Sequence, residues 1–341
     1  MIMRCGVDVG RSGVKAVSGV GRLFMAPLAT MVQVDREIPF ASFGNIIERE
    51  NGHAHARCLE VGYQGTRWWL GDEPERLGYP SVRQMTVVKA NSGTRLFILG
   101  ALAAMGGEGI VEVCIGLPVA LFEQQREEMT RLLAGSHDMT IGGDGREMVL
   151  RGMIVPEGYG LLVQASVSKE TGLDDDLLGR STAVLDFGQR TTQLALFRGK
   201  RMNPVSCSLH HAADEVFEGV LRDEVDAKLG SFFDPIMHAV MAQDLVLKGS
   251  VTVGSLTLTY ERLLPVLQVY ASRLWPRIEE EISRVLTGMM VERVVAGGGG
   301  VHLFAEKLKK RFGDGLVLLP DRFAQAEGYR LCVMHRSQLM G

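Results

Sequence analysis

The sequence lacks long hydrophobic runs, an excess of charge of either sign, and cysteines at paired spacing. It contains no stretch of about 18 consecutive apolar residues, which argues against a transmembrane helix, although 46% of its 341 residues are hydrophobic. The N-terminal residues lead directly into an expected strand over residues 5–9, which leaves no room for a signal peptide. We therefore expect a cytoplasmic protein that makes no contact with a membrane.

The net charge is −3, with acidic and basic residues interspersed along the chain. This balance gives no basic footprint, so we expect no direct contact with nucleic acid. The five cysteines form neither a CxxC pair nor a metal-ligand spacing, and we interpret them as small buried thiols in a reducing cytosol. They are Cys5, Cys58, Cys114, Cys207 and Cys332. A chain of this length usually forms two domains or one large one.

Two similar hairpin patterns, about half a chain apart, are the most informative feature of the sequence. Residues 5–17 read CGVDVGRSGVKAV, and residues 183–196 read AVLDFGQRTTQLAL. Each pattern predicts an apolar strand, a tight turn that carries Asp and Gly, and a second strand. One such turn could arise by chance, but two suggest a duplicated pair of domains that hold a phosphate between two hairpins. The predicted class is α/β with internal duplication rather than a simple doubly wound sheet.

Hydrophobic periodicity predicts the remaining elements. The expected helices cover residues 94–105, 122–134, 160–171, 212–229, 260–290, 301–311 and 323–334. Strands are expected at residues 110–117, 292–296 and 316–319, and a hairpin at 138–154. Pro265 and Pro276 would kink or split the longest helix. Residues 169–180 are polar and acidic, and we interpret them as a hinge or linker.

The first turn, DVGRSGVK, has the residue types of a phosphate-binding loop. Gly10 lets the backbone approach a phosphate, Ser12 adds a hydroxyl donor, and Lys15 neutralises phosphate charge from the adjoining strand. Asp8 would repel phosphate but can hold Mg²⁺, usually through water. The alternative is an ordinary hairpin turn, because Asp and Gly are common there.

The second turn, DFGQRTT, repeats this arrangement. Asp186 follows an apolar strand, so its carboxylate is expected at the end of that strand, where it could position Mg²⁺ or an attacking water. Gly188 again allows close backbone approach, and Thr191 is either a hydroxyl donor or a β-branched strand former. Arg190 could contact phosphate or lie at a subunit contact.

A third segment, VVAGGGGVHLF at residues 294–304, combines a strand, four glycines and a helix start. Free backbone amides at the positive end of a helix favour a nucleotide, and glycine lets a base or ribose lie against the backbone. The segment is not a GxGxxG motif with an acidic partner, which disfavours a dinucleotide-binding fold.

Together, these motifs and their order resemble the actin-like ATPases, which share a two-domain fold with sugar kinases and DnaK-type chaperones. The motifs are Asp8-x-Gly10, Pro156-Glu157, Asp186-x-Gly188-x-x-Thr191 and Gly298-Gly299-Gly300. Within that superfamily the chain is most similar to the ParM/StbA group of plasmid-segregation proteins and its archaeal relatives. IGLPVALF at 115–122, VPEGYG at 155–160 and FAQAEGYR at 323–330 are similar to segments of that group.

The resemblance implies an actin-like ATPase fold, with ribonuclease H-like duplicated domains and a nucleotide cleft between them. Domain I would cover residues 1–168, with a small subdomain at about 24–95, and domain II residues 181–322. Residues 323–341 would form a C-terminal helix that returns to domain I.

The same resemblance implies roles for individual residues. Asp8 and Asp186 would be catalytic and would hold Mg²⁺ through water, and Glu157 would position or activate the attacking water. Taken alone, Glu157 would more often be a solvated residue at a helix start. The implied nucleotide-binding residues are Gly10, Arg11, Ser12, Gly13, Lys15, Gly188, Gln189, Thr191, Asp214, Gly298, Gly299 and Gly300.

The sequence departs from the group at residues 209–214, LHHAAD, where a glycine pair often precedes the helix that covers the nucleotide. This departure leaves the choice between ATP and GTP open. His210 and His211 could suggest a metal site, but we interpret them as loop residues.

The implied function is a filament-forming ATPase that uses Mg²⁺ with ATP (or GTP), assembles head-to-tail and drives plasmid or DNA segregation. Its expected partners are further copies of itself and a DNA-binding adaptor protein at a centromere-like site. The alternatives are a small-molecule kinase of the same superfold, a cytoskeletal actin homologue without a segregation role, and a non-hydrolysing scaffold. The sequence carries no sugar-kinase-like substrate motif, and the retained Asp8, Glu157 and Asp186 argue against a scaffold.

Overall fold

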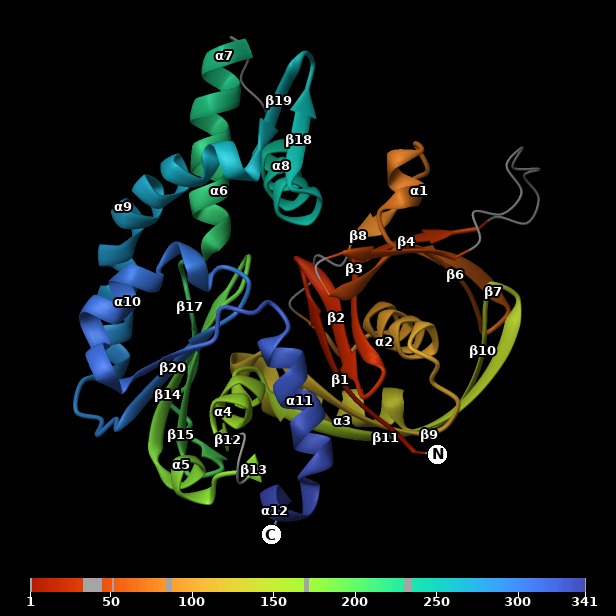
Figure 1. Ribbon diagram of the computed structural model, residues 1–341, viewed down its shortest axis with the longest axis horizontal. Coiled ribbons are helices and arrows are strands. Elements are labelled where there is room, and N and C mark those ends of the chain that lie inside the picture. Colours follow the sequence, from red (N-terminus) through yellow and green to blue (C-terminus); the bar gives the residue numbers. More distant parts are fainter. Residues whose placement is uncertain are drawn as a thin grey trace. The chain divides into compact units, whose positions relative to one another are not determined.

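The structure, a computed structural model, describes residues 2–32, 45–50, 52–83, 88–168, 172–229 and 235–340 (Figure 1). The chain divides into two compact units, residues 1–174 with 323–341 (unit 1) and residues 175–322 (unit 2). Within the described ranges, none of the helices combines the length and the apolar character that crossing a bilayer requires.

Unit 1 is built on one large mixed sheet. Its described strands follow the order β10-β11-β9-β1-β2-β3-β6-β7-β4-β8, and β5 pairs with β6. The strands are β1 (Met3–Gly10), β2 (Gly13–Ser18), β3 (Gly21–Met25), β4 (Leu28–Met31), β5 (Ile46–Glu50), β6 (His53–Tyr63), β7 (Thr66–Leu70), β8 (Val82–Arg83), β9 (Gly109–Leu117), β10 (Gly135–Ile141) and β11 (Asp144–Pro156). Because β10 also pairs with β6, the sheet closes on itself.

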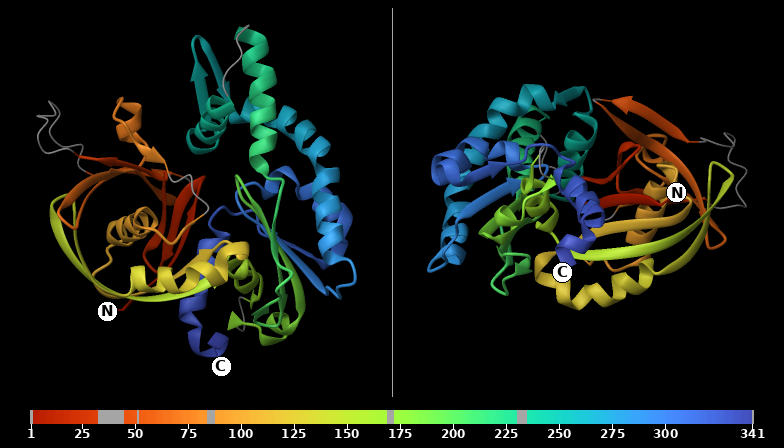
Figure 2. Two further views of the ribbon diagram at one scale, coloured as in Figure 1. Left: turned by 180° about the vertical axis from the view of Figure 1, so that it is seen from behind. Right: turned by 60° about the horizontal axis from the view of Figure 1, so that its bottom comes forward.

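The closed sheet surrounds one helix. Helix α2 (Ser92–Ala104) lies inside the curve of the strands (Figure 1, Figure 2). Its residues from Leu96 to Ala103 are all buried, as expected for a helix that is apolar all round. The other helices of the unit are α1 (Glu73–Arg76), α3 (Phe122–Leu133), α4 (Tyr159–Ala165), α11 (Ala324–Met334) and α12 (Arg336–Met340). Helix α11 packs on α4 and on β1.

Unit 2 contains a second sheet with strand order β16-β15-β14-β20-β21, in which β17 also pairs with β15. The strands are β14 (Ser181–Phe187), β15 (Thr192–Arg198), β16 (Arg201–Met202), β17 (Cys207–Leu209), β20 (Arg293–Gly297) and β21 (Leu316–Leu318). The other elements are α5 (Asp175–Gly179), α6 (Ala213–Leu221), a π-helical turn (Arg222–Asp226), α7 (Ala227–Leu229), α8 (Pro235–Lys248), β18 (Ser250–Val253), β19 (Leu256–Thr259), α9 (Tyr260–Leu286), α10 (Ala305–Phe312) and two 3-10 turns (Val301–Leu303 and Gly313–Gly315).

The two units share one strand arrangement, which confirms the predicted duplication. In unit 1, β1 pairs antiparallel with β2 and parallel with β9. In unit 2, β14 pairs antiparallel with β15 and parallel with β20. Each hairpin therefore lies beside a parallel strand that comes from later in the same unit.

Three local predictions were wrong or incomplete. The helix expected over residues 160–171 ends at Ala165, and β12 (Val167–Ser168) follows it, paired with β13 (Gly172–Leu173). Of the expected linker, residues 169–171 lie outside the described residues, and the remainder contains β13 and α5. Helix α8 and the β18–β19 hairpin were not expected at all.

Helix α9 runs through both of its prolines without being split. Each proline removes one backbone hydrogen bond, yet Pro265 and Pro276 both lie within the single helix. Its inner face is an apolar stripe that packs against α6 and holds the helix in place. The buried residues are Leu263, Leu267, Ala271, Leu274, Trp275, Ile278 and Ile282.

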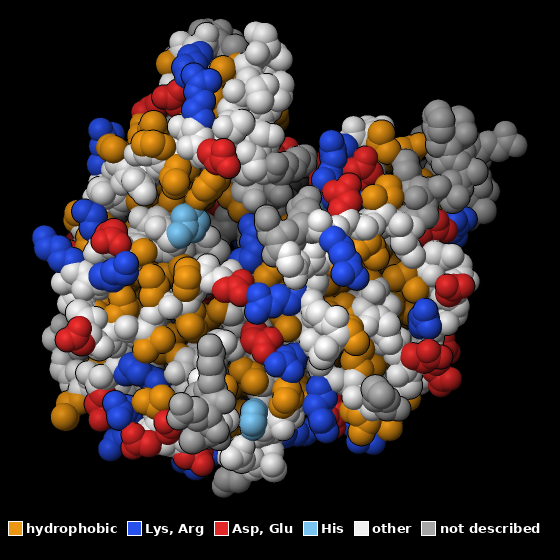
Figure 3. Space-filling view, viewed as in Figure 1, with side chains coloured by type: hydrophobic (Ala, Val, Ile, Leu, Met, Phe, Trp, Pro, Cys, Tyr) orange, Lys and Arg blue, Asp and Glu red, His pale blue; other side chains and the backbone are white. Residues whose placement is uncertain are grey.

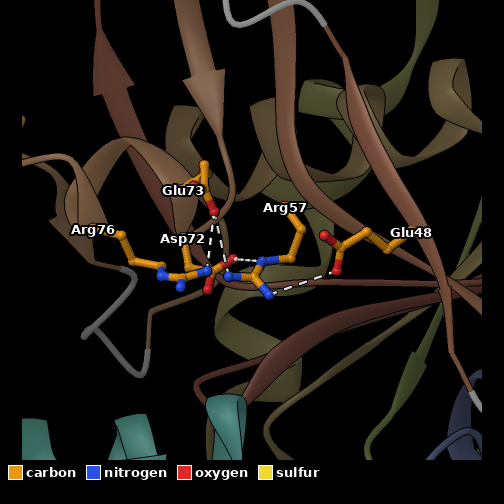
Figure 4. A network of polar contacts seen from close by, with 5 residues as sticks. All are labelled: Glu48, Arg57, Asp72, Glu73 and Arg76. Atoms are coloured by element: carbon orange, nitrogen blue, oxygen red, sulfur yellow. Dashed lines mark hydrogen bonds and ion pairs between the residues drawn. The ribbon is translucent and has the colours of Figure 1, made fainter. Parts of the chain in front are cut away.

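A polar network ties α1 to the sheet of unit 1 (Figure 4). The Arg57 guanidinium on β6 contacts Asp72 at 3.0 Å, Glu73 at 3.3 Å and Glu48 at 3.7 Å. Burial would lower the pKa of Arg57, but Asp72 above all, and then Glu48 and Glu73, hold it above its usual value. Because Asp72 is only 2% exposed, its charge depends on this partner.

We expect Arg57→Lys to reduce the free energy of unfolding of unit 1 by about 1–2 kcal/mol. An ammonium keeps the charge but cannot reproduce the fork of the guanidinium, so at least one charge-assisted hydrogen bond is lost. Arg76→Lys is the matched control, because Arg76 contacts the same Glu73 but its side chain is 48% exposed, and it should change stability by less than about 0.5 kcal/mol. Denaturant titration of both variants measures the difference, and equal effects would contradict the assigned role of Arg57.

Candidate functional site

The hairpin of β1 and β2 places a carboxylate opposite an ammonium. Asp8 and Lys15 are register partners, and Lys15 Nζ lies 3.1 Å from Asp8 Oδ2. A Cβ on Gly10 would lie 3.3 Å from Lys15 Nζ, so glycine leaves room beside the ion pair. Burial raises the pKa of Asp8, but the charges of Lys15 and Lys89 outweigh it and hold that pKa below its usual value.

Arg11 and Ser12 form the two-residue turn between the register partners Gly10 and Gly13. Both side chains are partly exposed. Gly13 has a φ of +151°, and a Cβ there would lie 2.2 Å from Cε2 of Phe24. Packing against this ring is therefore sufficient to require glycine at position 13, with or without a bound phosphate.

Glu157 lies at the end of β11, immediately before α4. Its backbone N–H donates to the carbonyl of Leu117 at 2.8 Å, and Gly158 follows in the left-handed conformation. Glu157 is 8% exposed, so it is not the solvated helix-start residue that its local sequence favours. Its Oε1 lies 2.5 Å from Nζ of Lys89.

Lys89 is the residue of this cluster that sequence reasoning missed. It comes before α2, and its ammonium is 4.0 Å from Asp8 Oδ1 as well as 2.5 Å from Glu157. Asp8, Lys15, Lys89 and Glu157 thus form one chain of alternating charges, which we call the unit 1 cluster. The only sequence signal at Lys89 is its place before the helix cap Asn91, which carries no information about the cluster.

The corresponding hairpin of unit 2 brings Asp186 against the glycine-rich segment. Gly298 has a φ of +91°, and a Cβ there would lie 2.3 Å from Asp186 Oδ1. The N–H of Gly300 donates to the carbonyl of Phe187 at 2.8 Å. Around Gly299, by contrast, no described atom lies within 4 Å of an added Cβ. Packing therefore explains why position 298 is glycine. It places no such requirement on position 299, where the backbone is exposed.

The turn after β14 is tied to the start of α6. The Gly188 N–H donates to the carbonyl of Thr191 at 3.0 Å, and the Asp214 N–H donates to the carbonyl of Gln189 at 2.8 Å. Arg190 Nε lies 2.9 Å from Asp214 Oδ2. The side-chain oxygen of Gln189 is buried and has no hydrogen-bond partner among the described residues.

The structure therefore gathers the expected site residues into two groups, one within each unit. The unit 1 group contains Asp8, Lys15 and Glu157, with the loop of residues 10–13 beside them. The unit 2 group contains Asp186, Asp214 and the glycine-rich loop. Among the described residues, no three His, Cys, Asp or Glu side chains gather as a set of metal ligands.

Comparison with known proteins identifies the fold. Residues 6–160 match the family model described as the N-terminal domain of actin-like proteins. The archaeal actin homologue Ta0583 is 18% identical, with 98% of this chain and 99% of that chain covered and a TM-score of 0.74. ParM from a 15-stranded Clostridium botulinum filament is 16% identical with 98% and 99% covered and a TM-score of 0.70. The chain has the actin-like fold.

A further structure with the actin-like fold is Bacillus thuringiensis ParM with AMPPNP, which is 15% identical, with 98% of this chain and 99% of that chain covered and a TM-score of 0.66. No curated protein matches the chain. The predicted resemblance to the actin-like proteins is thereby confirmed. The matched N-terminal domain contains all four residues of the unit 1 cluster.

Proposed function

We propose that this actin-like protein binds ATP with Mg²⁺, hydrolyses it and assembles head-to-tail into filaments. The observation that carries the proposal is the unit 1 cluster. In it, Asp8 on the hairpin and Glu157 at a strand end, with side chains 15% and 10% exposed, each lie beside a lysine ammonium. The similar proteins add support. Ta0583 has been solved in complex with ADP, the Bacillus thuringiensis ParM with AMPPNP, and the Clostridium botulinum ParM as a filament. GTP is an alternative nucleotide.

In this proposal, phosphates would lie against the loop of residues 10–13 and against Lys15, and residues 188–191 would receive the terminal phosphate. Glu157 would accept a proton from water as the water oxygen bonds to the terminal phosphorus and the bond to the leaving diphosphate breaks. Asp214 and residues 298–300 would hold the nucleoside. The unpartnered side-chain oxygen of Gln189 fits a site that a ligand completes.

Mg²⁺ would neutralise phosphate charge when it is bound. Asp8 and Asp186 would hold it through water, because Mg²⁺ keeps several waters and usually takes one or two carboxylates together with phosphate oxygens. The pairing of Asp8 with two lysines agrees with such an indirect role, since a carboxylate that is already engaged favours contact through water.

The proposed cellular task is plasmid or DNA segregation in the cytoplasm, with a separate adaptor protein that binds the DNA. On the face drawn in Figure 3, basic and acidic side chains are intermixed over the described residues of both units, without an extended basic field. This surface, together with the net charge of −3, suits an ATPase that contacts DNA through a partner.

We expect Mg-ATP to produce assemblies that scatter light and sediment, with phosphate released as they form. ADP should not support them, and AMPPNP should give assemblies that persist. The measurement is light scattering and pelleting in parallel with phosphate release, with electron micrographs of the pellet. Absence of nucleotide-dependent pelleting would contradict the filament, and ADP production that requires an added small-molecule acceptor would favour the kinase alternative.

A further inference from the structure

We propose that Lys89 is a positioning residue of the hydrolytic site, which holds Oε1 of Glu157 so that Oε2 is presented to the attacking water. This inference rests on the proposed hydrolysis of nucleotide and adds a residue that no motif in the sequence indicated. It is carried by the contacts of Lys89, by its burial, and by the way in which its backbone is fixed.

The Lys89 side chain is 12% exposed, and that of Glu157 is 10% exposed. A charged lysine at this depth requires carboxylate partners, because an unpaired buried ammonium is strongly disfavoured. Its partners among the described residues include the two carboxylates to which chemistry is assigned, Glu157 at 2.5 Å and Asp8 at 4.0 Å. Of these two contacts, the closer is with Glu157.

The backbone around Lys89 is fixed by side chains from two helices. Gln125 on α3 is buried, and its Oε1 accepts the N–H groups of Lys89 at 2.7 Å and Ala90 at 3.1 Å. Asn91 donates to the carbonyl of Val88 at 2.6 Å and accepts the N–H of Thr94 at 2.8 Å as the cap of α2. Three consecutive residues before α2 are thus held in place, which is the support that a positioned side chain needs.

Lys15 cannot take over this role in the structure. Its ammonium lies on Asp8 Oδ2, 3.1 Å away, and the hairpin register fixes it opposite Asp8. Both lysines contact Asp8, and Lys89 is the one of the two that also contacts Glu157. Without Lys89, Glu157 would be a buried carboxylate without its ammonium partner, free to rotate away from the water.

The test measures steady-state nucleotide hydrolysis and AMPPNP affinity for Lys89→Met and Lys89→Arg. We expect Lys89→Met to lower kcat by about 10- to 100-fold, the usual effect of losing a group that orients a catalytic side chain, with KM and AMPPNP affinity changed by less than about 3-fold. Lys89→Arg keeps the charge and should recover part of kcat. Lys309→Met, which removes a lysine from the exposed pair with Glu306, is the control and should behave as the wild type.

A double-mutant cycle decides whether Lys89 acts through Glu157. In a Glu157→Gln background, Lys89→Met should change kcat by less than about 2-fold, because the group that it positions is already lost. Independent effects that multiply would overturn the proposal, as would a 10-fold loss of AMPPNP affinity, which would make Lys89 a phosphate ligand.

The failure of this inference can be told apart from the failure of the proposed function. If the wild type hydrolyses nucleotide and Lys89→Met retains full kcat, only the inference about Lys89 fails. If the wild type shows no hydrolysis, the proposed function fails and the inference with it. Unfolding curves of each variant establish that the compared proteins are folded.

Discussion

Replacing Glu157 by glutamine is expected to lower the rate of nucleotide hydrolysis by about 10²- to 10⁴-fold, the contribution of a positioned general base. Glutamine preserves the shape of the side chain but cannot accept the proton of the attacking water. Nucleotide binding should persist, because the hairpin of β1 and β2 and residues 298–300 are untouched. Single-turnover phosphate release and AMPPNP binding measure the two properties separately.

The matched control is Glu112→Gln on β9, whose carboxylate pairs with Arg4, and it should leave the rate within about 2-fold of the wild type. If hydrolysis controls filament stability as proposed, Glu157→Gln should also assemble with Mg-ATP and fail to disassemble, a result visible as persistent light scattering. Wild-type turnover by Glu157→Gln would remove Glu157 from the chemistry and leave its burial beside Lys89 as a purely structural contact.

Periodicity and turn chemistry predicted the two hairpins because both are local properties. An apolar strand, a turn with Asp and Gly, and a second strand require only neighbouring residues, and β1–β2 and β14–β15 form as expected. The duplication could be predicted as well, because the same local pattern occurs twice. Glu157 came from the resemblance, since a Glu after Pro156 carries no local sign that it is buried.

Lys89 could not be predicted because its role depends on contacts distant in sequence. It meets Asp8 and Glu157, and its backbone is held by Gln125. No periodicity links these positions, and a lysine before a helix usually lies in solvent. The end of α4 at Ala165 could not be predicted for the same reason. The helix stops where β12 begins, and β12 forms by pairing with β13, a contact that exists only once the chain has folded back.

Gly328 is a further residue whose role depends on contacts distant in sequence. Gly328 lies in the middle of α11, where propensity alone disfavours it by about 1 kcal/mol relative to alanine. The helix was nonetheless predicted over residues 323–334, and nothing in its pattern explained the glycine. The structure explains it, because α11 meets α4 backbone to backbone at Gly160, and β1 approaches the same helix through Gly6.

We expect Gly328→Ala to destabilise unit 1 by about 3 kcal/mol, at the upper end of overpacking effects. A Cβ at this position would lie 1.8 Å from the carbonyl oxygen of Gly160 and 2.7 Å from its Cα. Backbone atoms cannot rotate away as the tip of a side chain can, so α11 would have to move off α4. That displacement outweighs the gain in helix propensity of about 1 kcal/mol, and the denaturation midpoint of unit 1 should fall.

The contrast is with Gly179→Ala in α5, where no described atom lies within 4 Å of an added Cβ. At this position only the difference in helix propensity between glycine and alanine acts, so this variant should be neutral or more stable by up to about 1 kcal/mol. Tryptophan fluorescence reports on unit 1 through Trp68 and Trp69 on β7 and on unit 2 through Trp275 on α9. Hydrogen exchange of the α11 amides shows whether that helix has separated from α4. A loss of stability in Gly328→Ala, together with no loss in Gly179→Ala, would show that close backbone packing rather than helix propensity requires glycine at position 328. An unchanged midpoint for Gly328→Ala would mean that α11 does not approach α4 this closely in solution.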